Sequence, residues 1–64
     1  MKDYRAILKK HREMKGLSQN QLAKQLGITQ TFLSEIERGR KNPSVEQFFA
    51  ICDALELQLF PDEG

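Results

Sequence analysis

The sequence predicts an all-α domain, a compact bundle of four to five short helices, followed by a short C-terminal segment with the pattern of a β-strand. Apolar residues recur at helical spacing along most of the chain. Runs of helix-forming residues end at Gly16, Gly27 and Gly39, where a left-handed residue can close a helix. Ser18 and Ser44 each precede a glutamine by three positions, as in a capping box. These start and stop signals divide the chain into short helices.

A chain of 64 residues is expected to be one domain, spanning residues 1–64, near the lower size at which a fold is stable without a partner. The single cysteine, Cys52, excludes an internal disulfide. With a single histidine, His11, we expect no metal site and no cofactor. No apolar run approaches the ~18 residues of a membrane span and no signal peptide is recognisable, so a cytoplasmic protein is expected.

Charge is distributed unevenly along the chain, although the net charge is only +1. Residues 1–16 carry six basic and two acidic side chains, a net charge of +4, and residues 17–43 carry a net charge of +2. Residues 44–64 hold five acidic side chains and no lysine or arginine, a net charge of −5. A basic body that faces a polyanion is one interpretation, and ordinary solvated helix faces are the other.

Caps and apolar faces predict helices at roughly 3–15, 18–25, 29–37 and 44–55. The residues expected to cap their N-termini are Asp3, Ser18, Thr29 and Ser44. The first helix is the least clear, because it combines few apolar residues with a long basic face. The fourth has an apolar stripe, flanked by Phe49 and Ile51, that consists of Val45, Phe48, Cys52 and Leu55.

The second and third expected helices form a closely joined pair at about 18–38. Short joints that contain glycine produce steeply crossing helices. Gly27 permits the positive φ that such a turn demands, and the small Ala23 lets the two helices approach each other. The core of the pair is expected to contain Leu22, Ala23, Leu26, Gly27, Ile28, Leu33 and Ile36.

The six residues that end at Phe60 mostly alternate apolar with polar side chains, which makes the tail at 56–64 a candidate β-strand. A single strand needs a ladder partner, and the same segment of a second subunit would supply one. Leu57, Leu59 and Phe60 are the candidates for this dimer contact. The alternative is a fifth helical turn, or coil, that lays Leu57 and Phe60 on the core.

The stretch that carries these signals resembles the helix-turn-helix domain of the phage repressor and Cro family, also called the XRE family, over about residues 4–55. The matching features are Leu17-Ser18-Gln19, Ala23, Gly27, Glu37-Arg38-Gly39 and Asn42-Pro43-Ser44. The resemblance implies a bundle of the lambda-repressor-like type with its functional centre at 17–39. It also implies a bacterial or phage-encoded protein.

By this resemblance, the helix that begins at Thr29 lies in the major groove of DNA with its first residues at the base edges. Glutamine can bond adenine N6 and N7, and threonine can offer a hydroxyl or a methyl group. The residues expected at the bases are Gln30, Thr31, Ser34 and Glu35. Glu35 has two interpretations: it accepts from cytosine N4, or it pairs with Arg38 on the same helix.

Backbone phosphates are expected at the start of the second helix and along the basic loop after the third. The residues expected there are Ser18, Gln19, Arg38, Arg40, Lys41 and Asn42. Gln19 also matches a family position that braces the first base-reading residue. Arg12 and Glu37 match positions that form a buried ion pair between the first and third helices, and the alternative is two exposed charges.

The resemblance implies a sequence-specific transcriptional regulator, a repressor, that binds double-stranded DNA as a homodimer on a palindromic operator. Two alternatives stay open. One is a HipB-like antitoxin, which binds a toxin as well as its own operator, and the other is the controller protein of a restriction-modification system. An enzyme is not expected, and no residue is a candidate for catalysis, because the sites of His11 and Cys52 suit packing.

Overall fold

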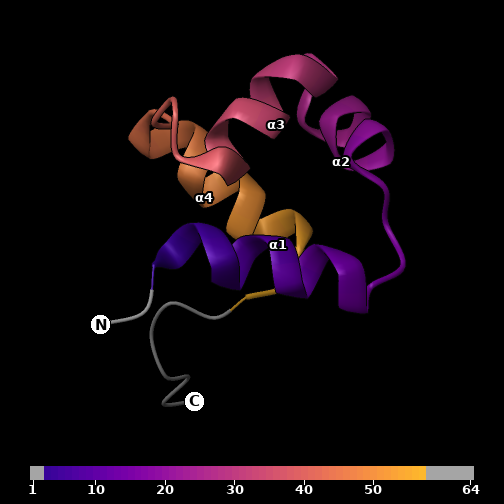
Figure 1. Cartoon of the computed structure of the whole chain (residues 1–64). Helices are drawn as coiled ribbons and strands as arrows, with labels where there is room; N and C mark the ends of the chain where they lie inside the picture. Colours follow the sequence, from indigo (N-terminus) through magenta and orange to yellow (C-terminus); the bar gives the residue numbers. More distant parts are fainter. Residues whose placement is uncertain (1–2, 58–64) are drawn as a thin grey trace.

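The computed structural model describes residues 3–57, which form an all-α bundle as predicted (Figure 1). Its elements are α1 (Tyr4–Met14), α2 (Gln19–Leu26), α3 (Gln30–Arg38) and α4 (Val45–Ala54). Each helix lies within one or two residues of its expected bounds. None of the helices in residues 3–57 combines the length and the apolar character needed to cross a membrane.

All four helices begin at the residues that local sequence rules select. The side chains of Asp3, Ser18, Thr29 and Ser44 each accept a hydrogen bond from a backbone amide of the first turn that follows. At Ser18 and Ser44 the glutamine three positions later also returns a bond to the cap amide, which completes both capping boxes. Local polar groups therefore set where each helix starts.

The joint between α2 and α3 is closed by Gly27, whose φ of 72° lies in the left-handed region. The amide of Ile28 donates to the carbonyl of Ala23 at 3.0 Å, and the amide of Gly27 donates to Lys24 at 3.3 Å. These bonds satisfy carbonyls that the end of α2 would otherwise leave unpaired. The turn is thus three residues long, and Thr29 caps the next helix at once.

The core lies where α1, α2, α3 and α4 meet, and its most deeply buried side chains are Leu22, Leu33, Ile36 and Ile51. Ala23 is 2% exposed at the contact between α2 and its neighbours, as the need for close packing predicts. Leu26 and Ile28 are only half-buried, and they pack against the edge of this core. Burial of these apolar surfaces is the main stabilising contribution to the fold.

The apolar stripe expected on α4 is wrong at its first position. Val45 is 70% exposed, whereas Phe48, Ile51, Cys52 and Leu55 turn toward the core at helical spacing. The first turn of α4 lies at the edge of the bundle (Figure 1), where Val45 is left exposed. Phe48, one turn further along α4, packs against the core and makes an edge-to-face contact with the ring of Tyr4, at a centroid distance of 5.5 Å.

The end of α4 differs from the expected strand. Glu56 has a φ of 58°, in the left-handed region, and the amide of Leu57 donates to the carbonyl of Cys52 at 2.8 Å. This hydrogen bond closes the helix, so an extended strand does not include Glu56. Leu57 packs against the core, in agreement with the alternative prediction for this residue. The rest of the tail, with the dimer candidates Leu59 and Phe60, lies outside the described residues.

Candidate nucleic-acid interface

The four residues expected to read DNA bases lie along α3 in two groups. Gln30 and Thr31 are exposed at the start of the helix, directly after the Thr29 cap. Ser34 and Glu35, one turn later, are half-buried. The first pair is therefore open to a ligand, while the second is partly covered by the protein itself.

Of the two interpretations of Glu35, the ion pair with Arg38 is not found among the described residues, and Glu35 pairs with Arg40. Its carboxylate lies 3.9 Å from the guanidinium of Arg40, and no ion pair with Arg38 occurs in residues 3–57. After Gly39 the chain folds back, because the amides of Arg40 and Lys41 both donate to the Glu35 carbonyl, at 2.9 and 3.3 Å. This turn, and not helical spacing, brings the basic side chain to Glu35.

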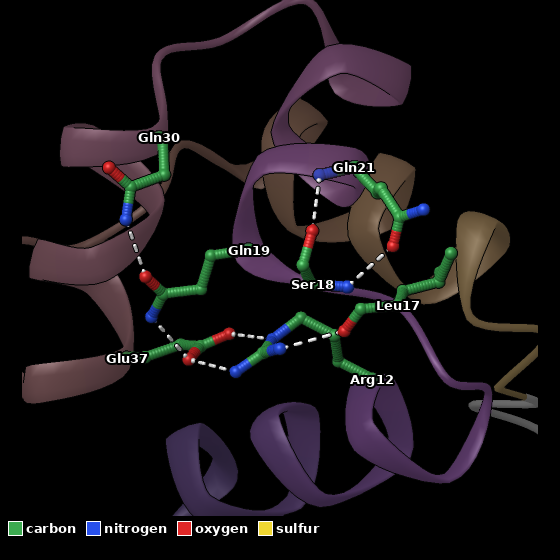
Figure 2. A network of polar contacts seen from close by, with 7 residues as sticks. All are labelled: Arg12, Leu17, Ser18, Gln19, Gln21, Gln30 and Glu37. Atoms are coloured by element: carbon green, nitrogen blue, oxygen red, sulfur yellow. Dashed lines mark hydrogen bonds and ion pairs between the residues drawn. The ribbon is translucent and has the colours of Figure 1, made fainter.

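A buried ion pair joins α1 to α3, as expected for Arg12 and Glu37 (Figure 2). Arg12 Nε donates to Glu37 Oε2 at 2.8 Å, and Nη2 donates to Oε1 at 3.0 Å. The two side chains are only 8% and 4% exposed. The hydrogen bond to Glu37 raises the pKa of Arg12, against the opposing effect of burial. The third nitrogen, Nη1, donates to the carbonyl of Leu17 at 2.8 Å and so fixes the turn before α2.

Gln19 and Gln30 extend this ion pair to the surface (Figure 2). Gln19 Nε2 donates to Glu37 Oε1 at 2.9 Å, and Gln30 Nε2 donates to Gln19 Oε1 at 2.7 Å. Gln19 is thus bonded to Gln30, the first of the residues expected at the bases. The network connects α1, α2 and α3 through side chains that are 11 to 25 positions apart in sequence.

The start of α2 presents free backbone donors beside the exposed end of α3. The hydroxyl of Ser18 accepts from the amide of Gln21 at 3.1 Å, and the Gln21 side chain accepts from the Ser18 amide at 2.8 Å. Among residues 3–57, the amides of Gln19 and Asn20 have no acceptor. Two unpaired amides and the positive end of the helix dipole favour an anion at this point.

The last residue of α3 and the loop that follows it contribute three exposed basic residues, Arg38, Arg40 and Lys41. Asn42, also expected at phosphate, instead accepts a hydrogen bond from Arg5 Nη2 of α1. The same guanidinium pairs with Asp3 at 3.1 Å and lies 4.7 Å from the centroid of the Tyr4 ring. Sequence reasoning missed Arg5, because nothing in the basic face of α1 distinguishes it from the other cations.

The residues considered for other chemistry do not form a site. Cys52 is buried in the core, and this burial raises the pKa of its thiol, which keeps the thiol in its unreactive form. In residues 3–57, no group of three His, Cys, Asp or Glu side chains is placed to hold a metal ion. The exposed ends of α2 and α3 are therefore the candidate interface.

Comparison with known protein families matches residues 8–60 to the family described as Helix-turn-helix. The chain belongs to this family, in its phage repressor and Cro type. The α2–α3 pair supplies the two helices and the turn that give the family its name. The family resemblance drawn from the sequence is thus confirmed.

Three relatives show the range of proteins that share this domain. The HTH-type transcriptional regulator SlrR of Bacillus subtilis is 43% identical over 54 residues, which are 83% of this chain and 36% of SlrR. The ImmF control region 10 kDa protein of Bacillus phage phi105 is 41% identical over 54 residues, 84% of this chain and 60% of that protein. Antitoxin HipB of Escherichia coli O6:H1 is 40% identical over 48 residues, 75% of this chain and 51% of HipB. The matched segment thus spans between about a third and three-fifths of these relatives.

Proposed function

We propose that this chain is a sequence-specific, double-stranded DNA-binding regulator of transcription that acts in the cytoplasm as a homodimer on a palindromic operator. Membership in the helix-turn-helix family supports DNA binding, and the relatives include proteins named as transcriptional regulators. The observation that carries the proposal is the exposed start of α3, where Gln30 and Thr31 are open to a ligand and Gln30 is bonded to Gln19 at the start of α2.

In the proposed complex α3 lies in the major groove and Gln30 and Thr31 meet base edges. Ser34 and Glu35 lie one turn further along and are partly covered, so we give them a smaller share of base reading. Glu35 in particular is placed beside Arg40, which lowers the electrostatic cost of bringing a carboxylate near phosphates.

Backbone phosphates would bind on both sides of the recognition helix. Ser18 and Gln19 offer a helix N-terminus on one side, and Arg38, Arg40 and Lys41 offer exposed cations on the other. Asn42 is given a different role, because it is bonded to Arg5 and holds the loop against α1. Contacts of this kind position the protein and supply affinity without reading sequence.

A homodimer is proposed because one recognition helix has too small a footprint for useful discrimination. Two copies would read half-sites about one helical turn, ~34 Å, apart. The candidates for the contact between the copies remain Leu57, Leu59 and Phe60 of the tail. Of these, Leu57 already packs on its own core, so the contact would rest mainly on the other two.

A second candidate function is that of an antitoxin, with a toxin as its protein partner. It is favoured by the 40% and 38% identity to two proteins named Antitoxin HipB. The two functions share DNA binding through α3 and differ in what the acidic C-terminal part of the chain contacts. Copurification of the chain with the product of a neighbouring gene would favour the antitoxin.

The test is selection of binding sites from a random duplex pool, followed by titration of the selected duplex with the full chain. We expect an inverted repeat that binds two copies, and a log–log salt slope of about −0.9 for each phosphate contacted. Replacing Gln30 and Thr31 by alanine should abolish the sequence preference, whereas Gln25→Ala, an exposed glutamine of α2, should retain it. Unchanged preference in the Gln30→Ala, Thr31→Ala variant would contradict the proposal.

A further inference from the structure

We propose that Glu37 is a positioning residue for base reading: the buried ion pair sets the direction of the Gln30 amide through Gln19, and thereby the base that Gln30 prefers. The inference rests on the proposed function, because it concerns the same surface. The role that it adds is that of Glu37, which lies too deep to touch DNA and acts through Gln19.

The argument starts from the chemistry of the buried pair. A guanidinium has only donors, and an ionised carboxylate has only acceptors. Glu37 Oε1 receives both Arg12 Nη2 at 3.0 Å and Gln19 Nε2 at 2.9 Å. Since the carboxylate offers no donor, Gln19 must turn its NH₂ group inward and its carbonyl oxygen outward.

The same reasoning continues one step outward. Gln19 Oε1 is only an acceptor, so Gln30 must turn its NH₂ group toward it, at 2.7 Å. Reversing either amide would place two oxygens or two NH₂ groups against each other. A free glutamine on a helix surface has no such restriction, because its two amide orientations are nearly equal in energy. The ion pair therefore transmits a fixed polarity across three side chains (Figure 2).

The consequence appears at the exposed end of the chain of bonds. The carbonyl oxygen and the second N–H of Gln30 have no other partner in residues 3–57. Because the first N–H is held by Gln19, the relative positions of this free acceptor and this free donor are fixed. In the major groove adenine shows an acceptor and a donor side by side, whereas guanine shows two acceptors. Only one orientation of a fixed amide matches that pair, so fixing the amide converts a general hydrogen-bonding group into a reader of one base.

The experiment uses Gln19→Met in the full chain, because methionine keeps the length of the side chain and removes both amide bonds while Arg12 and Glu37 stay paired. The base pair read by Gln30 is defined as the one at which Gln30→Ala loses its preference. A bidentate contact gives a preference of about 5- to 150-fold at such a position. We expect Gln19→Met to reduce this preference at least about threefold there, and to leave the preferences at the other positions unchanged.

Two controls separate positioning from a general loss of binding. Gln25→Met, the same change at an exposed site of the same helix, should behave like the natural chain. In the Gln30→Ala background, Gln19→Met should cause no further loss at the Gln30 position. Full retention of the preference in Gln19→Met, or equal losses at all positions, would overturn the inference.

A readout without DNA keeps this inference distinct from the proposed function. In Glu37→Gln the new amide at position 37 can present either an oxygen or an NH₂ group to Gln19. Gln19 can then adopt both orientations, so the side-chain amide of Gln30 should lose its single orientation. We expect its ¹⁵N–¹H signals to shift or broaden, while those of Gln47, held in its own capping box, stay in place. Unchanged Gln30 signals would overturn the inference even if the chain selects no DNA site, an outcome that by itself contradicts only the proposed function.

Discussion

Among residues 3–57, two ion pairs connect α1 or its C-cap residue, Lys15, to distant parts of the chain, and they differ in burial and in their number of hydrogen bonds. Arg12 and Glu37 are 8% and 4% exposed and are joined by two hydrogen bonds. Lys15 and Glu56 are 34% and 77% exposed and are joined by one. The first pair joins α1 to α3, and the second joins Lys15, at the end of α1, to Glu56, just after α4.

Burial gives the two pairs different roles. Charges removed from water depend on each other, because either one alone would carry an uncompensated desolvation cost. The exposed pair is largely solvated and screened, so its loss leaves both groups in water. The buried pair also bonds the Leu17 carbonyl and the Gln19 amide, so it organises the surface above it. The exposed pair has no further hydrogen-bond partner among residues 3–57.

The largest effect is expected from removing one partner of the buried pair. Arg12→Met should lower the free energy of unfolding by about 3–5 kcal/mol, because it leaves the Glu37 carboxylate buried without its cation. That loss approaches the whole stability of a domain of this size. Urea unfolding followed by circular dichroism measures it, with Lys15→Met as the matched control. Similar losses in the two variants would show that burial does not distinguish the pairs.

Removing both charges should restore part of this loss. Arg12→Met combined with Glu37→Met leaves no stranded charge. We expect its free energy of unfolding to be at least about 1 kcal/mol higher than that of Arg12→Met alone. The same double variant should lose the base preference of Gln30, since Gln19 then has no carboxylate to orient it. Denaturant unfolding and binding to the selected duplex check the two halves. A double variant less stable than the single one would contradict the interpretation of the buried pair.

The smallest effect is expected at the exposed pair, as a dependence on acidity. The hydrogen bond from Lys15 lowers the pKa of Glu56 below its usual value of 4.5. Because this pKa is lower in the folded state, the pair stabilises the fold above about pH 4.5, and the contribution is lost as the pH falls through the lowered value.

An NMR titration of the Glu56 carboxyl group measures this shift directly. Lys15→Met, or 1 M salt in the natural chain, should return the pKa to its usual value. The accompanying change in urea midpoint should be smaller than for any variant of Arg12. A Glu56 pKa that does not respond to Lys15→Met would show that the pair contributes nothing in solution.

Most of the fold was predictable because its signals are local. The Ser18 cap bonds an amide three positions later in the sequence. The amide of Gly27 bonds carbonyls three and four positions earlier. The residues that decide these helix boundaries are therefore neighbours in sequence. The Arg12–Glu37 pair was reached by the family resemblance. The prediction failed at Val45, because helical spacing shows which residues share a face but not how far along the helix that face is covered.

The sequence by itself determined the four helices, the turn at Gly27 and the residues that α3 presents at its start, through hydrogen bonds and steric limits that act over a few residues. Only the tertiary structure decided which polar groups meet. Arg5 reaches Asn42 across 37 positions, Glu35 lies beside Arg40 because the chain turns back, and Gln19 bonds Glu37 across 18 positions. Hydrogen bonds act over about 3 Å, and which side chains come that close depends on how the helices pack.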